Sequence, residues 1–420
     1  MIKLTPRDRP LAYLLVAFLV LEIFSYSTLW IKHVFFPYVG PQPNTELKKI
    51  ISSRYSVDSK LLLEDVNAVH SGSGPTYHPY RWYMAKANYK GHYAITDQYG
   101  FRNDRTKIKK DTEKIAFFGG STMWSTSTRQ EGTIPAFINR MTNNDIVETL
   151  NFGVGAYEST AELMTFMEVS RHEKKIKYAV FYSGANEGVL LTNKILETRE
   201  NNLNNPLYEV MGFPFLRITR LGIGNTDYMF SSISGTDVAL KRKNEGYIPY
   251  SYQLARKFLK IVNSKFSEIQ STEAYLKSDN EYKLAAESAK NIYLSNIKDI
   301  TALALSKGIV PVFILQPLIF TTTKKQMTQG EALIIKHSEN PILNLRKLLE
   351  EIYTAIKKSK EFHEYNFFDL SESLNKLDEK AHFIDFCHVS EDANRIIAES
   401  IFEQLKNFIP KEYYTVKTQS

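Results

Sequence analysis

The first strong pattern in the chain is an apolar run from Leu11 to Trp30, close to the ~20 residues that cross a bilayer core. Lys3, Arg7 and Arg9 precede this run and favour a cytoplasmic N-terminus under the positive-inside tendency. No small-residue cleavage site follows it, so an uncleaved anchor is favoured over a removed signal peptide. We therefore expect a single-pass membrane protein whose remaining chain is extracytoplasmic.

Glu22 is the discordant residue of this run, because a carboxyl at mid-bilayer costs roughly 2.5–3.5 kcal/mol on insertion scales. We expect it to be protonated or to face a partner helix. The alternative is a buried or signal-type helix.

Farther along, short apolar runs alternate with segments of helical character. The runs predict buried strands at 115–118, 146–152, 178–182, 309–315 and 366–370. Helices are predicted at 134–141, 160–171, 281–307, 342–358 and 394–408. Strands that alternate with helices form a parallel sheet covered on both faces. The expected fold is therefore α/β: a three-layer α/β/α, flavodoxin-like domain with a five-stranded parallel sheet and an N-terminal transmembrane helix.

This pattern divides the chain into four parts. They are an anchor (1–38), a stalk and lead-in that packs partly on the next domain (39–111), a catalytic domain (112–410) and a tail (411–420). Residues 192–279 break the strand–helix rhythm with Asn/Gly-rich loops and a basic helical piece near 254–266, which predicts an insertion or cap. The lead-in also contains a turn at Tyr99–Arg102, to which the sequence assigns no function.

The composition argues against nucleic-acid binding, against an intrachain disulfide and against a thiolate metal cluster. A hydrophobic content of 43% and a charged content of 24% are ordinary for a globular protein of 420 residues. The net charge of +7 is mild and no dense Lys/Arg block is present, so no nucleic-acid groove is expected, only a weak preference for anionic polymers or lipid head groups. The single cysteine, Cys387, rules out an intrachain disulfide and a thiolate metal cluster.

Four polar segments lie at the ends of predicted strands or follow them along the chain. They are Gly119–Thr122, Asn151–Ala156, Ser183–Glu187 and Asp385–His388. Ligands of open α/β sheets bind beyond the carboxyl ends of the strands, so we expect all four segments at one rim.

Each segment fits a role in acyl transfer. Ser121 needs an adjacent base to act as a nucleophile, and His388 supplies one. Asp385, three positions earlier, is expected to face His388 on a helical turn and hold its tautomer. The oxyanion requires donors, for which the candidates are the Ser121 N–H, a backbone N–H at Gly155 or Ala156, and the Asn186 side chain.

These four blocks, in this order, resemble those of the SGNH (GDSL-type) hydrolase superfamily, in its membrane-anchored Gly-Gly-Ser-Thr branch. The resemblance covers roughly residues 112–410. Gly120 stands where the family usually has Asp, and Ala156 where it usually has a glycine that donates its N–H. An alanine can replace that glycine as donor only if the backbone does not need a positive φ.

The resemblance implies a serine-dependent esterase that removes O-acyl groups, chiefly O-acetyl, from an envelope or exported glycan through an acyl-serine. The alternatives are an O-acyltransferase to a glycan hydroxyl and a non-catalytic envelope scaffold or binding protein. No metal or organic cofactor is expected. The expected partners are an acylated carbohydrate or other ester, the membrane through residues 11–30 and envelope-assembly proteins.

Several neighbours of the blocks have two interpretations. Trp124 and Tyr157 are candidate substrate contacts, but core packing is the favoured interpretation of both, and Gln316 at the end of the fourth strand is a third candidate contact. Cys387 is expected to be buried and to point away from His388, and Glu187 to support its neighbours rather than act as an acid.

Overall fold

The computed structural model describes most of the predicted catalytic domain and part of what precedes it. The described residues are 13, 17–18, 20–27, 53, 55–70, 76–78, 81–109, 111–188, 276, 278–321, 327–338, 344–375 and 382–414. The chain divides into two compact units, and the unit formed by 44–237 and 275–420 holds the sheet and every labelled helix and strand described below. The predicted insertion lies almost wholly outside the described residues, as does the helical piece near 254–266.

The predicted anchor is described only in part. Residues 13, 17–18 and 20–27 are helical. No helix among the described residues combines the length and apolar character that crossing a membrane requires.

The larger unit is built on a five-stranded parallel sheet in the order β4-β3-β5-β6-β7. Its strands are β3 (Glu113–Gly119), β4 (Val147–Asn151), β5 (Ile176–Ser183), β6 (Val310–Leu315) and β7 (Phe367–Asp369). Each coincides with one of the five predicted strands, and the order is the flavodoxin-like one, so both predictions are confirmed.

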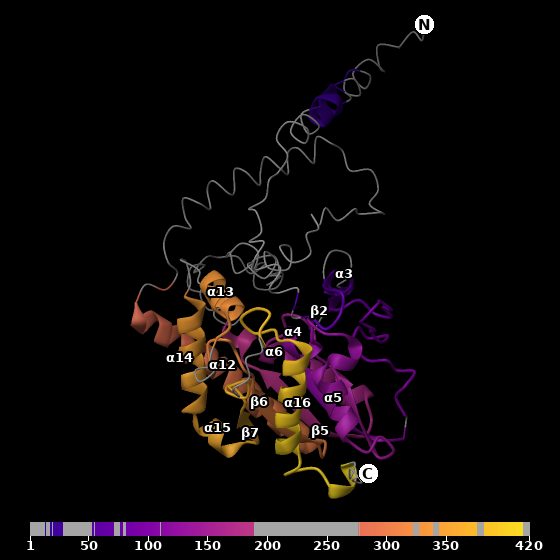
Figure 1. Cartoon of the computed structure of the whole chain (residues 1–420), viewed down its shortest axis with the longest axis vertical. Helices are drawn as coiled ribbons and strands as arrows, with labels where there is room; N and C mark the ends of the chain where they lie inside the picture. Colours follow the sequence, from indigo (N-terminus) through magenta and orange to yellow (C-terminus); the bar gives the residue numbers. More distant parts are fainter. Residues whose placement is uncertain are drawn as a thin grey trace. The chain divides into compact units, whose positions relative to one another are not determined.

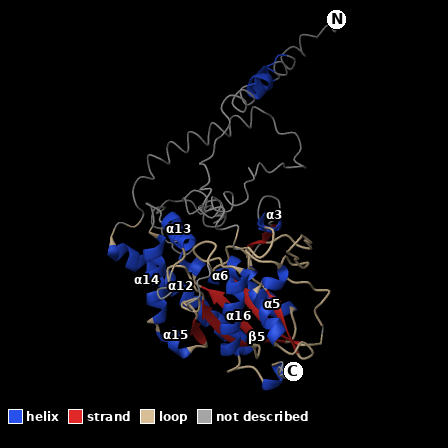
Figure 2. Cartoon of the chain, viewed as in Figure 1, coloured by secondary structure: helices blue, strands red, loops and turns tan. Residues whose placement is uncertain are grey.

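Helices cover both faces of this sheet (Figures 1 and 2). On one face α5 (Ile134–Met141) packs against α16 (Glu391–Leu405). On the other face α12 (Asp279–Ser306) packs against both α6 (Ser159–His172) and α14 (Leu345–Lys357). The shorter helices are α3 (Ser59–His70), α4 (Ser121–Trp124), α13 (Gln329–Ser338), α15 (Lys360–Glu364), η1 (Gln130–Gly132) and η3 (Lys411–Tyr413). The three-layer prediction is confirmed.

Stacked aromatic side chains lie next to one another near the carboxyl ends of the strands. The Phe118 ring stacks on Phe181 and Phe152, with centroids 4.9 and 5.3 Å apart, and Phe181 stacks on Phe313 at 5.4 Å. Aromatic rings bury large apolar areas, and the stacking adds to that burial. The carboxyl ends of β3, β4, β5 and β6 are therefore supported by closely packed aromatic rings.

The lead-in is an integral part of the same unit. It begins with α3 and a small hairpin of β1 (Thr76–His78) and β2 (Trp82–Met84). Asp65 of α3 accepts the backbone N–H groups of Tyr93 and Ala94 at 2.6 and 2.9 Å. Asn103 exchanges two hydrogen bonds with the backbone of Asn151, at 2.8 and 3.0 Å. The lead-in thus continues onto the end of β4, beside the rim where polar segments were predicted.

Candidate active site

The nucleophile candidate begins the one-turn helix α4 directly after β3. Gly120 precedes it, and a Cβ added to Gly120 would lie 2.3 Å from Nδ2 of Asn186 and 2.9 Å from the Tyr157 carbonyl oxygen. Only a residue without a side chain allows this approach. Position 120 therefore requires a glycine in this arrangement.

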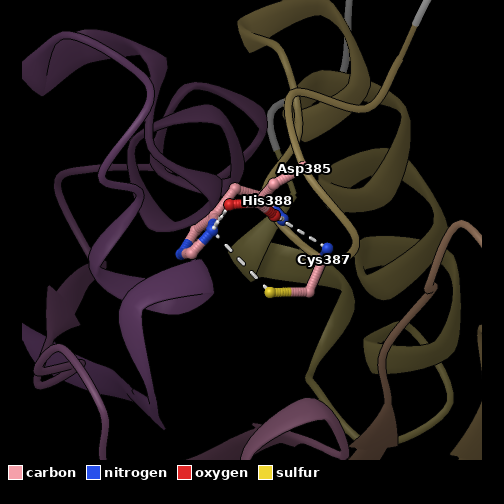
Figure 3. A group of neighbouring side chains, drawn as sticks. All are labelled: Asp385, Cys387 and His388. Carbon is pink, nitrogen blue, oxygen red and sulfur yellow. Dashed lines mark hydrogen bonds and ion pairs between the residues drawn. The ribbon is translucent and has the colours of Figure 1, made fainter. Parts of the chain in front are cut away.

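Ser121, His388 and Asp385 form one continuous hydrogen-bonded chain. The Ser121 Oγ lies 2.7 Å from Nε2 of His388, and Nδ1 of His388 lies 2.5 Å from Oδ2 of Asp385. Ser121 and His388 are 267 positions apart in sequence. In Figure 3 the imidazole extends from the C-terminal loop toward ribbon of the first half of the chain. A serine in this geometry can lose its proton to the imidazole as the oxygen attacks a carbonyl.

The loop that carries Asp385 and His388 is not the helical turn that we predicted from their spacing. An isolated bridge pairs Phe383 with Val389, and the Ile384 N–H donates to the His388 carbonyl at 2.9 Å. The segment therefore closes as a tight loop, and the i, i+3 pair meets across it. The prediction failed because three-residue spacing suits both geometries.

The carboxylate of Asp385 is fixed from both sides. Its Oδ1 accepts the backbone N–H groups of Cys387 and His388 at 2.9 and 2.7 Å, which leaves Oδ2 for the imidazole. Burial alone would raise the pKa of Asp385, but the adjacent His388 and these donors outweigh it and hold the pKa below its ordinary value. The group is thus kept as an anion that can stabilise an imidazolium.

Cys387 is buried, as predicted, but it does not point away from the base. Its Sγ lies 3.7 Å from Nδ1 of His388 (Figure 3). Asp385, Cys387 and His388 offer one ligand atom each within 4.8 Å. Burial, followed by the nearby Asp385, raises the pKa of the thiol well above its ordinary value, which disfavours the thiolate that a metal binds. The imidazole Nδ1 is already bonded to Asp385, so this group suits proton transfer better than metal binding.

Ala156 adopts the conformation that its glycine counterpart would favour. Its φ is +58°, in the left-handed region where an alanine is strained, so the condition expected from the sequence, a backbone without a positive φ, is wrong: the alanine adopts this conformation and keeps its N–H. Tyr83 of β2 donates its hydroxyl to the Gly155 carbonyl oxygen. In a trans peptide the carbonyl and the next N–H point in opposite directions, so the Ala156 N–H is directed away from Tyr83. It has no hydrogen-bond partner within the described part of the chain.

Asn186 and Glu187 tie two rim loops together. The Asn186 side chain donates to the Tyr157 carbonyl at 2.7 Å. The Glu187 carboxylate accepts the N–H of Ser159 at 2.9 Å and that of Gly184 at 2.7 Å, which agrees with the supporting role predicted for it. Burial, together with the nearby Glu158, raises the pKa of Glu187 to about 7.

The predicted substrate contacts are all buried. Trp124, Tyr157 and Gln316 are 0%, 1% and 2% exposed. Trp124 and Tyr157 are core residues, as the favoured interpretation has it, so neither presents a ring face on which a sugar could stack, and the alternative of a substrate contact is wrong for them. The Gln316 Oε1 accepts the hydroxyl of Thr122 at 3.1 Å, so this side chain supports the turn after Ser121.

Sequence reasoning missed the residues that the lead-in contributes. Tyr83 holds the loop after β4, and His70 at the end of α3 lies with its ring 4.4 Å from that of Trp124. Burial and the nearby Arg102 lower the pKa of His70 to about 3, so it is neutral. The only signal in the sequence was the turn Tyr99–Arg102, which stood out without a role.

Comparison with known proteins gives no family model and no curated relative that matches the chain. Among solved structures, a lipolytic protein of the G-D-S-L family from Desulfitobacterium hafniense has a TM-score of 0.35 at 10% identity, covering 70% of this chain and 100% of that one. A GDSL-like lipase from Bacteroides thetaiotaomicron has a TM-score of 0.34 at 9% identity, covering 72% and 91%. A catalytic mutant of an acetylxylan esterase from Geobacillus stearothermophilus has a TM-score of 0.34 at 10% identity, covering 71% and 96%. Scores this low assign no chemistry, which has to come from the site itself.

Proposed function

We propose that the protein is a serine esterase of the SGNH type that cleaves O-acyl esters through an acyl-serine intermediate. The observation that carries the proposal is the unbroken chain from Ser121 through His388 to Asp385, with both links within hydrogen-bond distance. The two other sequence blocks support the proposal, because they supply the loops after β4 and β5 that contain Ala156 and Asn186.

The proposed reaction has two halves. In the first, His388 takes the Ser121 proton while Oγ attacks the ester carbonyl, and the tetrahedral intermediate collapses as the imidazolium protonates the departing alkoxide. In the second, His388 takes a proton from water as the water oxygen attacks the acyl-serine, and the imidazolium returns that proton to Oγ of Ser121 as the carboxylic acid leaves. Asp385 stabilises the imidazolium in both halves and stays ionised.

The proposed oxyanion donors are the backbone N–H of Ser121, the N–H of Ala156 and the Asn186 amide. Ala156 is chosen over Gly155 because its N–H belongs to the Gly155–Ala156 peptide, whose carbonyl oxygen Tyr83 holds by a hydrogen bond. Donors held in place before the reaction stabilise developing charge without reorganisation, and the loss of one typically costs about 10²–10³ in rate.

The substrate class is proposed from the resemblance of the sequence blocks: an O-acetylated glycan of the envelope or an exported polysaccharide. We also propose that residues 11–30 anchor the chain, with the catalytic unit extracytoplasmic. The length of the apolar run and the basic residues before it support this placement. Protease accessibility in intact spheroplasts tests it, because a cytoplasmic catalytic unit would remain protected.

The central test uses the full-length protein in detergent and its Ser121→Ala variant. Wild type should hydrolyse p-nitrophenyl acetate and react covalently with a fluorophosphonate at Ser121, while the variant should do neither above background. Adding an acetylated glycan, with and without a non-acetylated acceptor, separates release of acetate from transfer to a sugar. A wild-type protein that is neither labelled nor active on any of these esters would refute the serine-esterase assignment.

A further inference from the structure

The lead-in turn Tyr99–Arg102 places a buried cation behind the nucleophile turn. Arg102 is 2% exposed, and each of its five N–H groups lies within hydrogen-bond distance of a neutral oxygen. The acceptors are the main-chain oxygens of Tyr93, Trp124, Ser125 and Thr128 and the side-chain oxygen of Gln130, at 2.6–3.1 Å. Three of these five acceptors belong to the few residues that follow Ser121.

Arg102 has no carboxylate within ion-pair distance in the part of the chain that the structure describes. Its guanidinium carbon instead lies 4.2 Å from the centroid of the Trp124 ring. Burial lowers the pKa of Arg102 to about 9, so it stays charged near neutral pH. Burying an unpaired cation is costly, and only a full set of hydrogen bonds offsets that cost.

The carbonyls that Arg102 holds complete the turn that starts at Ser121. The N–H groups of Ser125 and Thr126 both donate to the Ser121 carbonyl, at 2.8 and 3.2 Å. Ser125 has a φ of +65°, a left-handed conformation that is strained for a serine. Its carbonyl makes the shortest of the five bonds to Arg102, at 2.6 Å. The guanidinium therefore stabilises the tight exit from α4.

We propose that Arg102 is a positioning residue for the nucleophile. It binds the carbonyl groups of the residues that follow α4, and in this way fixes the position of the Ser121 backbone N–H and hydroxyl relative to His388. The expected effect of Arg102 on the reaction rate rests on the proposed function. Its expected effect on the conformation of the turn does not. A misplacement of about 1 Å at a reacting group can cost ~10²-fold in rate.

The test compares Arg102→Met and Arg102→Lys with Arg105→Met. Arg105 is the matched control, because it also belongs to the lead-in but binds Asp97 and Glu173 and does not touch the nucleophile turn. For each protein we would measure thermal stability, amide hydrogen exchange at Ser125 and Thr126, kcat and KM for p-nitrophenyl acetate, and the rate of fluorophosphonate labelling.

In Arg102→Met the two amides should exchange about tenfold faster or more, and kcat and the labelling rate should fall ~10²-fold with little change in KM. Arg102→Lys keeps the charge without the planar fork, so it should lie between Arg102→Met and wild type. It also provides the comparison if Arg102→Met does not fold. Arg105→Met should leave exchange and kcat near wild type even where it lowers stability.

Two outcomes would overturn the inference. One is wild-type exchange at Ser125 and Thr126 in both Arg102 variants. The other is an equal loss of kcat in Arg105→Met at the same loss of stability, which would make Arg102 a support of the fold only. A wild-type protein without esterase activity would refute the proposed function, while the exchange experiment would still decide whether Arg102 holds the turn.

Discussion

Tyr83 and Gly155 are 72 positions apart, and the tyrosine hydroxyl donates to the glycine carbonyl oxygen. Tyr157 in turn donates its own hydroxyl to the Tyr83 carbonyl, and the two rings meet edge to face with centroids 5.4 Å apart. The lead-in hairpin is thus bonded twice to the loop that presents the Ala156 N–H. The orientation of this loop depends on a segment that precedes the sheet.

Tyr83→Phe should therefore reduce turnover without weakening substrate binding. The Gly155–Ala156 peptide would lose the bond that fixes its orientation, and kcat should fall by about tenfold to 10²-fold while KM stays within a small factor. Steady-state hydrolysis of p-nitrophenyl acetate measures both constants. Tyr89→Phe is the control, since Tyr89 also lies in the lead-in but donates its hydroxyl to Asp65. Equal effects of the two substitutions would contradict a specific role for Tyr83.

Gly120→Ala should disable the Asn186 donor. The new methyl group would need the space that Nδ2 of Asn186 occupies, so the amide must move, and kcat should fall about 10²-fold. A cycle with Asn186→Ala checks the cause. If both single changes remove the same interaction, the double variant should be no slower than the slower single variant. Multiplicative losses would show that Gly120 acts in another way.

Ala156→Gly should be active and at least as stable as wild type, whereas Ala156→Val should lose most activity. Glycine adopts a φ near +58° without the strain of about 1–2 kcal/mol that an alanine carries, although part of this gain is lost to unfolded-chain entropy. A β-branched residue is an outlier at positive φ and would force the loop to change. Thermal unfolding and kcat of both variants provide the measurement. An active and stable valine variant would disprove the need for a left-handed residue here.

The raised pKa of Glu187 predicts a pH-dependent stability. Its pKa is about 7 in the folded protein against an ordinary value of 4.5, so the folded state binds this proton more tightly than the unfolded state. Its contribution is therefore fully present below about pH 4.5 and is lost as the pH rises through about 7. Glu187→Gln removes the titration, so its stability relative to wild type should improve between about pH 5 and pH 8 by on the order of 2 kcal/mol.

Urea unfolding of both proteins at the two pH values tests this. The fixed loss of one hydrogen bond in Glu187→Gln cancels from the comparison, because only the change with pH matters. Exposed Glu64→Gln on α3 serves as the control and should run parallel to wild type. If the free energy of unfolding of Glu187→Gln also changes with pH in parallel with wild type, another group takes up the proton.

The parts of the fold that follow from local pattern were predictable. All five strands are short apolar runs, and in a parallel sheet their carboxyl ends meet at one rim, which is why Ser121 and His388 could be assigned together despite their separation. The spacing of Asp385 and His388 gave their pairing but not the shape of their loop. The sequence left two interpretations of Trp124, because an aromatic residue beside a nucleophile can pack inward or face a substrate, and its burial in the structure decides for packing.

The contribution of the lead-in could not be predicted for a physical reason. Tyr83 and Arg102 act through backbone carbonyls of distant loops, and any residue type can supply a carbonyl. No periodicity or residue pair in the sequence marks such a contact. Only tertiary packing decides which carbonyl a buried arginine or tyrosine meets, so these residues became visible only in the three-dimensional structure.

The separation of Ser121 from His388 also bears on when the protein becomes reactive. The serine follows the first strand of the sheet to be synthesised, while His388 lies on a loop after the last one. A chain still leaving the ribosome or crossing a membrane carries the hydroxyl without the imidazole that activates it. Under the proposed function, Ser121 can therefore act on an ester only after the segment that carries His388 has been synthesised and has folded against it.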